Sequence, residues 1–175
     1  MTSFEAHRAD GNPSTAIREI GILTDFTCNL ACDGCEIGSN LRIDDGITLH
    51  DRLRWIDLLA DRCDEFGFII KSYGIIGGEP FVNPDNLLKI AKHVRFRNPE
   101  SDLMISSNGL LIARSAGVLS DLKALGAHIS VTLHDDSDAI LTKFTAGLYA
   151  LKNSGISHSI GGLPLPGQTD LRPGT

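Results

Sequence analysis

Residues 68–94 read FIIKSYGIIGGEPFVNPDNLLKIAKHV, and this stretch contains one full unit of the fold. An apolar run over residues 68–76 indicates a strand, and a Gly-Gly turn ends it. Asn83-Pro84 is a typical helix start, because Asn is a good helix cap and Pro suits the first helical position. The apolar residues that follow share one helical face, and they are Leu87, Ile90, Ala91 and Val94. The stretch therefore predicts a strand, a turn and a core-facing helix.

The same alternation of apolar runs and helical patterns continues on both sides of this unit. Further strands are expected over residues 17–26, 103–106, 128–133 and 157–163. Further helices are expected from Thr48 to Gly67, over 111–125, and from Ser137 to Gly155. Strand and helix units of this size favour parallel strands joined by right-handed crossovers. The predicted fold class is α/β, a partial (reduced) β/α barrel of about five parallel strands with outer helices.

The two ends of the chain depart from this pattern. Residues 1–16 are rich in polar and turn-forming types and are expected to form a loose leader. Residues 164–175 are expected to form an irregular tail without a sixth strand, because their prolines lack the donor that a ladder needs. The barrel is therefore assigned to residues 17–163, and its sheet is expected to be open on at least one side.

Composition limits the classes of function. With 175 residues the chain is long enough for one domain with a real core, and a net charge of −6 without a Lys/Arg cluster gives no nucleic-acid footprint. No stretch approaches the roughly 18 apolar residues of a membrane span. Residues 1–8 lack the apolar core of a signal peptide. The predicted location is the cytoplasm, where reducing conditions keep thiols free.

Three cysteines lie close together directly after the first predicted strand. Cys28, Cys32 and Cys35 have the spacing C-x3-C-x2-C. Each iron of a [4Fe-4S] cube takes one thiolate, so three clustered cysteines would leave one iron open to another ligand. Structural zinc usually takes four ligands in two spaced pairs, and neither His50 nor Cys63 belongs to a second pair. A disulfide cannot pair all three cysteines. The spacing therefore favours an iron–sulfur cluster, with zinc as the alternative.

Other candidate segments also follow predicted strands. Segment 77–80 follows the second strand, Asn108 the third and His134 the fourth, just as the cysteines follow the first. In β/α barrels, functional residues gather at the carboxyl ends of the strands. The order of these segments therefore predicts one shared site at that end of the sheet.

These segments together resemble the radical S-adenosylmethionine (SAM) superfamily. The cysteine spacing is similar to its signature, residues 77–80 (GGEP) to its GGEP segment, and residues 107–109 (SNG) to its TNG-type turn. Residues 130–134 (SVTLH) resemble its fourth-strand segment, so the resemblance covers about residues 17–163. The family usually has an aromatic residue just before the third cysteine, where this chain has Gly34.

The resemblance implies the cofactors and the reaction. Cys28, Cys32 and Cys35 would hold a [4Fe-4S] cluster, and SAM would chelate its open iron. An electron from an external flavodoxin- or ferredoxin-like donor would cleave SAM to a 5′-deoxyadenosyl radical, which abstracts hydrogen from a substrate. The substrate is expected to be a small molecule or a peptide of unidentified structure.

The resemblance also implies a set of SAM-binding residues. The two glycines would bring the backbone close to the ligand, and the Glu79 carboxylate suits the SAM ammonium. Hydroxyls at alternate strand positions face one side of the sheet and would bond the ribose. The predicted set is Gly77, Gly78, Glu79, Pro80, Ser106, Asn108, Ser130 and Thr132. A Gly-Gly turn with a solvated Glu, and ordinary strand hydroxyls, are the structural alternatives.

His134 and Asp135 are the candidate catalytic residues, although the segment also suits a helix cap at Asp136 or Ser137. Three other functions compete with the enzyme. They are a radical SAM activase acting on a partner protein, a non-catalytic iron–sulfur module for binding or electron transfer, and a zinc-stabilised interaction domain. Intact Glu79 and its preceding glycines favour the enzyme, since an electron carrier has no need of an amino-acid ligand site.

Overall fold

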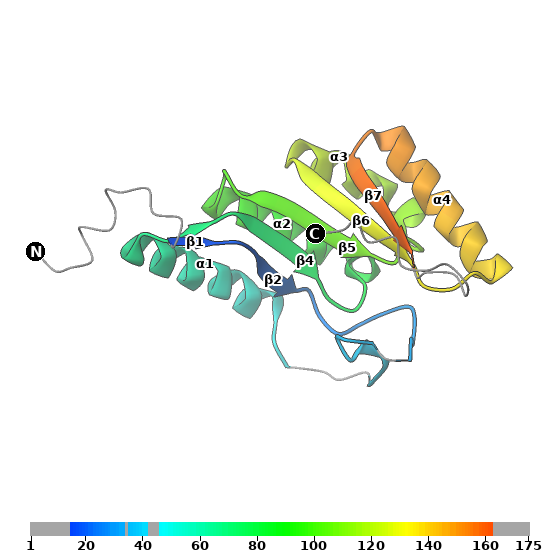
Figure 1. Ribbon diagram of the computed structural model, residues 1–175, viewed down its shortest axis with the longest axis horizontal. Helices are drawn as coiled ribbons and strands as arrows, with labels where there is room; N and C mark the ends of the chain where they lie inside the picture. Colours follow the sequence, from blue (N-terminus) through cyan, green and yellow to red (C-terminus); the bar gives the residue numbers. More distant parts are fainter. Residues whose placement is uncertain (1–14, 34, 42–45, 163–175) are drawn as a thin grey trace, which may run out of the picture.

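A five-stranded parallel sheet forms the centre of the protein (Figure 1). The computed structural model describes residues 15–33, 35–41 and 46–162. The strands lie across the sheet in the order β2 (Ile20–Leu23), β4 (Ser72–Ile76), β5 (Asp102–Ser107), β6 (Ala127–Leu133) and β7 (Ser157–Gly162). All neighbours are parallel. The predicted α/β fold is confirmed. Gly34, most of the predicted leader and the predicted tail lie outside the described residues.

Two predicted strands are divided in the structure. The strand expected over 17–26 consists of β1 (Ala16–Ile17) and β2, and the one expected over 68–76 consists of β3 (Ile69–Ile70) and β4. β1 and β3 pair with each other in a separate ladder. At Lys71 the backbone changes partners, because its N–H donates to the Ile17 carbonyl at 2.9 Å while its own carbonyl accepts from Asp102 N–H at 2.8 Å. An apolar run in the sequence gives no sign of such a change.

The described α-helices are α1 (Leu49–Phe66), α2 (Pro84–Arg97), α3 (Ala116–Ala124) and α4 (Asp138–Ser154). The predicted helix starts of α1 and α2 are confirmed. Thr48 and Asp51 form a capping box, and Asn83 Oδ1 accepts from Asn86 N–H at 3.2 Å. The helix expected over 111–125 begins instead as the 3-10 turn η5 (Ile112–Ser115), and α3 follows it.

The two faces of the sheet differ in burial. Side chains along β5 alternate between exposed and buried, and the buried face packs against the helices. Ile105 on this face is in register with Ile22, Ile75 and Ile129 of neighbouring strands, so that four isoleucines form a row across the core. Burying each of these side chains contributes about 1.5–3 kcal/mol, so the row fixes which face turns toward the helices. The other face, turned toward the viewer in Figure 1, is covered by none of the described α-helices, and we call it the helix-free face.

β2 and β7 are the edge strands of the sheet. Among the residues that the structure describes, no further strand pairs with their outer sides, so the predicted open sheet is confirmed for this part of the chain. The expectation about residues 164–175 lies outside it. None of the described helices is long and apolar enough to cross a membrane.

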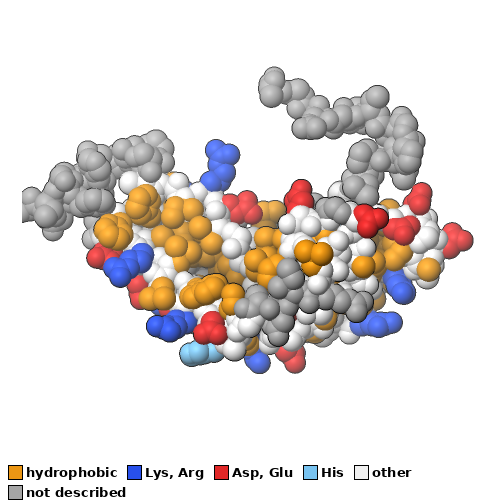
Figure 2. All heavy atoms as spheres, turned by 90° about the horizontal axis from the view of Figure 1, so that it is seen from below, with side chains coloured by type: hydrophobic (Ala, Val, Ile, Leu, Met, Phe, Trp, Pro, Cys, Tyr) orange, Lys and Arg blue, Asp and Glu red, His pale blue; other side chains and the backbone are white. Residues whose placement is uncertain are grey.

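A groove of about 350 Å³ lies between edge strand β2 and helix α1. Its walls include the residues of β2 together with Trp55, Ile56 and Leu59 of α1. Figure 2 shows hydrophobic side chains gathered on the α1 side of the molecule. None of the predicted site residues lines this groove, but its walls also include Leu23 and Arg52, which lie next to the start of the cysteine-containing loop.

Candidate cofactor site

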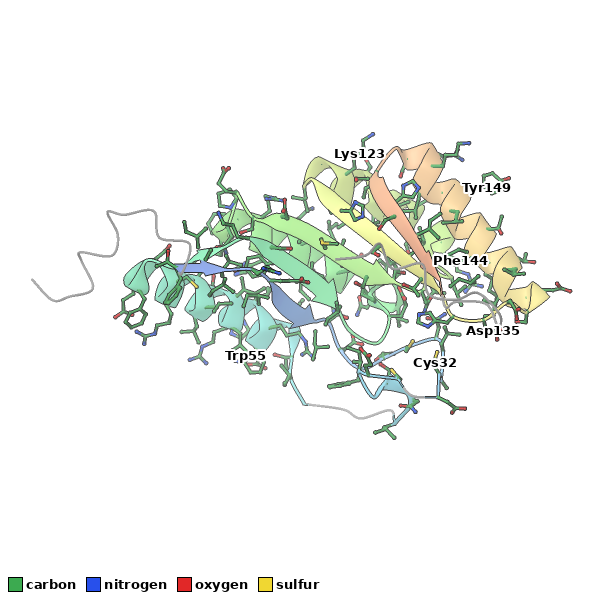
Figure 3. The ribbon with its side chains drawn as sticks, viewed as in Figure 1. Cys32, Trp55, Lys123, Asp135, Phe144 and Tyr149 are labelled. Atoms are coloured by element: carbon green, nitrogen blue, oxygen red, sulfur yellow. The ribbon has the colours of Figure 1, made fainter. Side chains whose placement is uncertain are left out.

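Three segments meet at the carboxyl ends of β2, β4 and β5. They are the cysteine loop (residues 24–33 and 35), the Gly-Gly-Glu-Pro turn (77–80) and the Ser-Asn-Gly turn (107–109). Hydrogen bonds connect the Gly-Gly-Glu-Pro turn to both of the others. Cys32 and Asp135 both lie on loops beyond the strand ends (Figure 3). The structure thus brings together segments that the sequence assigned to one shared site.

The three cysteines of the loop are free and partly buried. In the part of the chain that the structure describes, no three Cys, His, Asp or Glu side chains are gathered as around a single metal ion. The thiolate ligands of a [4Fe-4S] cube lie farther apart than the ligands of a single metal ion, since each thiolate binds a different iron. Burial raises the pKa of the Cys28 thiol, and the nearby Glu79 carboxylate and the thiols of Cys32 and Cys35 add to this effect.

Backbone N–H groups point at two of the sulfur atoms. Leu30 N–H donates to Cys28 Sγ at 3.4 Å. Desolvation acts to raise the pKa of Cys35, but hydrogen bonds from the backbone N–H groups of Ser39 and the two residues before it bring the pKa below its ordinary value. Such donors stabilise a thiolate, which is the form that binds a metal. The donor set of the loop therefore fits an iron–sulfur cluster.

The glycines of the Gly-Gly-Glu-Pro turn bring its backbone against the base of the cysteine loop. A Cβ on Gly77 would lie 2.3 Å from Thr24 Oγ1, and a Cβ on Gly78 would lie 2.1 Å from the carbonyl oxygen of Thr27. Gly78 N–H donates to the Asp25 carbonyl at 2.8 Å. Only residues without side chains fit here. The close approach expected toward a ligand is observed toward the loop backbone, and contact with SAM stays a prediction.

The Glu79 side chain is buried and bonded within the protein. It is 2% exposed, which rules out the solvated alternative. Its Oε1 accepts from Phe81 N–H at 3.0 Å and from the Ser107 hydroxyl at 2.8 Å, while Oε2 accepts from Asn108 N–H at 2.7 Å. Burial raises the pKa of Glu79, and these hydrogen bonds partly oppose the shift. The adjacent Pro80 is buried at the start of the 3-10 turn η4 (Pro80–Val82).

Asn108 extends this connection to the cysteine loop. It is buried, and its Oδ1 accepts from Leu110 N–H at 3.1 Å, which orients the amide. Its Nδ2 donates to Asn29 Oδ1 at 2.9 Å and lies 3.9 Å from Cys28 Sγ. The Ser-Asn-Gly turn therefore holds the loop at Asn29, whereas Gly78 contacts it at Asp25.

Three further residues build the site, and the sequence patterns did not predict this role for them. Ser107 was seen only as part of a turn, whereas its hydroxyl bonds Glu79. Asn29 gave no signal beyond its place next to a cysteine. Arg52 is 5% exposed, and its Nε donates to the Leu23 carbonyl at 2.8 Å, just before the cysteine loop. A charged residue on the buried stripe of α1 was the signal for Arg52.

The predicted ribose-binding hydroxyls lie farther across the sheet. Ser106, Ser130 and Ser159 are in register on β5, β6 and β7, on the helix-free face. Thr132 Oγ1 lies beside Gly161, 3.7 Å from where a Cβ would be. The alternation of strand positions correctly predicted the shared face of Ser106, Ser130 and Thr132. Their contact with ribose stays a prediction.

His134 and Asp135 are exposed at the end of β6. Asp135 Oδ1 accepts from Ser137 N–H at 2.7 Å, at the entry to α4. Ser137 is the N-cap residue, but its side chain makes no capping hydrogen bond. The helix entry is thus held by Asp135, rather than by Asp136 or the Ser137 side chain. No hydrogen bond described here joins Asp135 to the cysteine loop.

Fold and site together define a β/α domain with a three-cysteine loop at the carboxyl ends of its strands. The sequence matches the Radical SAM superfamily over residues 24–172, and the protein belongs to this family. No curated protein matches the sequence. A solved structure described as native anSMEcpe with bound AdoMet and Cp18Cys peptide is similar in fold, with a TM-score of 0.53 and 16% identity. The likeness covers 83% of this chain and 42% of that one, so the chain spans less than half of that protein.

Proposed function

We propose that the protein is a radical SAM enzyme that cleaves SAM reductively and abstracts a hydrogen atom from a substrate. The observation that carries this proposal is the loop of three free cysteines, joined by hydrogen bonds to the Gly-Gly-Glu-Pro and Ser-Asn-Gly turns. Family membership supports the reaction type. When bound, the cluster and SAM supply a one-electron reduction that yields a 5′-deoxyadenosyl radical.

The residues of this chain would bind and orient the cofactors. Cys28, Cys32 and Cys35 would hold a [4Fe-4S] cluster as thiolates, helped by the backbone donors at Cys28 and Cys35. The turn at 77–80 and Asn108 would fix the loop, and this turn would lie next to the amino acid group of SAM. The hydroxyls of Ser106, Ser130 and Thr132 would bond the SAM ribose on the helix-free face.

The substrate is proposed to be a small molecule or a peptide that reaches the helix-free face. The structure of similar fold has AdoMet and a peptide bound, which favours a peptide for this chain too. An external flavodoxin- or ferredoxin-like protein would supply the electron, and the exposed face would also admit a partner protein. His134 and Asp135 remain candidates near the substrate. We expect the protein to act in the cytoplasm, where thiols stay reduced.

Anaerobic reconstitution tests the proposal directly. The protein is loaded with iron and sulfide, given SAM and a strong reductant, and analysed for 5′-deoxyadenosine. The expected result is about four irons per chain and release of 5′-deoxyadenosine. Changing Cys28, Cys32 or Cys35 to Ala should abolish both, whereas the buried Cys63 on α1 provides the matched control, C63A. A stoichiometric zinc ion in protein that never takes up iron would contradict the proposal.

A further inference from the structure

A continuous set of hydrogen bonds joins Glu79 to both neighbours of Cys28. The Glu79 N–H donates to the Thr27 carbonyl at 2.8 Å. The Glu79 carboxylate accepts from Asn108 N–H at 2.7 Å, and the Asn108 side chain donates to Asn29 Oδ1 at 2.9 Å. The same amide nitrogen lies 3.9 Å from Cys28 Sγ. Glu79 and Asn108 therefore hold the cysteine from two sides.

The Glu79 carboxylate accepts hydrogen bonds from donors within this chain. Both of its oxygens accept hydrogen bonds, from Phe81, Ser107 and Asn108, and the residue is 2% exposed. Buried carboxylates are stabilised by such donors, and removing them leaves an uncompensated charge. A direct ion pair with a ligand ammonium would have to compete with these bonds. The geometry therefore favours a connection inside the protein.

We propose that Glu79 is a positioning residue that acts through Asn108 on the Cys28 thiolate, and so sets the reduction potential of the cluster. This inference rests on the proposed function, because it needs a cluster at the three cysteines. Hydrogen bonds to ligand sulfurs are one of the factors that set cluster potentials. A donor stabilises the more negative, reduced form most, so losing the donor lowers the potential.

Four variants separate the connection from the charge. N108A removes the amide that faces Cys28, and the nearly isosteric N108D replaces it with a carboxylate oxygen. E79A removes the acceptor that holds the Asn108 backbone. E79Q keeps an oxygen for Asn108 N–H and carries no charge, although its amide nitrogen takes the place of the oxygen that accepts from Phe81 N–H. Each reconstituted variant is studied by EPR-monitored redox titration and by SAM binding.

The expected potentials fall in a fixed order. N108A shifts to lower potential, and N108D shifts furthest because it adds a negative charge near Cys28. E79Q and E79A both lose the charge of Glu79, so they are compared with each other, and E79A lies below E79Q because it alone loses the acceptor for Asn108 N–H. SAM affinity in E79Q stays within about threefold of the unchanged protein, which is less than the loss of one neutral hydrogen bond. The double variant E79A/N108A should shift the potential by less than the sum of the single shifts, since both act on one network.

Asn98→Ala is the matched control, because Asn98 donates from its amide to the Tyr73 hydroxyl at 2.9 Å, outside the network of Glu79. It should leave the potential unchanged. Unchanged potentials in N108A and N108D would overturn the inference. So would an E79Q variant that loses SAM affinity as strongly as E79A at an unchanged potential, because that result means direct ion pairing. If E79A does not fold, E79Q and N108D decide the question.

The proposed function and this inference fail in different ways. An unaltered protein that takes up no cluster overturns both. An unaltered protein that releases 5′-deoxyadenosine, with N108D at the same potential, overturns only the role of Glu79 and Asn108. A cluster that forms without SAM cleavage contradicts the enzyme, while the potentials of the variants still decide the positioning role.

Discussion

The two halves of the candidate site are built in different ways. In the half at β4 and β5, Glu79, Ser107 and Asn108 are buried and bonded to one another. In the half at β6 and β7, Ser130 and Thr132 are partly exposed on the helix-free face. We call these the braced half and the open half. Groups that are buried and satisfied serve to position, while exposed hydroxyls remain accessible to a ligand. We therefore propose that the braced half positions the cysteine loop and that the open half binds the ligand.

Gly78→Ala should have the largest effect, because it breaks the braced half at its tightest contact. The new methyl would lie 2.1 Å from the Thr27 carbonyl oxygen, which is backbone and cannot move aside alone. We expect a loss of about 3 kcal/mol in the free energy of unfolding and failure to load iron. Thermal unfolding and iron analysis measure the two effects.

Gly117→Ala is the matched control for this substitution. A Cβ on Gly117 in α3 would meet nothing within 4 Å, and Ala is a better helix former than Gly. Stability should be unchanged or slightly higher, and iron loading should be retained. A G78A variant that loads iron like G117A would show that the turn does not brace the loop.

Alkaline pH should lower the stability of the folded protein through Tyr73, which lies on the buried side of β4. Burial raises its pKa to about 12 from the ordinary value of 10.0. Between these values the unfolded chain loses the phenolic proton and the folded chain keeps it, so stability falls as pH rises. The full loss is about 3 kcal/mol. Urea unfolding at a series of pH values measures this fall.

Y73F should remove this part of the pH dependence, whereas Y149F should keep it, because Tyr149 is 62% exposed. The two tyrosines are the only ones in the sequence, so the absorbance of phenolate can be assigned by the two variants. If the pH dependence of Y73F equals that of the unchanged protein, the β4 side is not desolvated as described.

T132V tests the open half with a smaller effect. Valine keeps the shape of the strand residue and removes the hydroxyl expected to bond the ribose. SAM should bind about 3- to 10-fold more weakly, which corresponds to one hydrogen bond, while iron content and cluster potential stay the same. Isothermal titration of the reconstituted protein measures the affinity. S159A, on the neighbouring edge strand, is the control for a change on the same face. If T132V binds SAM as tightly as the unchanged protein, this hydroxyl does not bond the ribose and is an ordinary strand hydroxyl.

Local patterns predicted the parts of this fold that depend on local physics. The Thr48–Asp51 capping box and the Asn83-Pro84 start involve residues that are close in sequence, and both were predicted correctly. The division of the β3–β4 strand at Lys71 depends on partners from two other strands, so the apolar run did not predict it.

In the candidate site too, features that depend on residues close in sequence were predicted, and features that depend on distant residues were not. The position of the cysteines and of the turn at 77–80 came from their place after strands, which is a property of the chain order. The hydrogen bonds of Glu79 to Ser107 and Asn108 cross 28 and 29 residues, so its direction into the protein could not be predicted from its neighbours. In the sequence alone, a carboxylate in a glycine-rich turn is as consistent with binding a ligand as with hydrogen bonds inside the protein.

Asp135 is a candidate catalytic residue that also holds the entry to α4. Its Oδ1 accepts from Ser137 N–H at 2.7 Å, as a helix-entry acceptor does. D135A should therefore lower the free energy of unfolding by about 0.5–1 kcal/mol, whereas D135N, which keeps an acceptor oxygen, should be nearly neutral. A proton-transfer role predicts a different pattern, with both variants losing about 10²- to 10⁴-fold in turnover of the substrate. Because D135N keeps an acceptor for Ser137 N–H and loses the base, a comparison of its stability with its rate separates the two roles. Equal losses of turnover in D135N and D135A would place Asp135 in the chemistry.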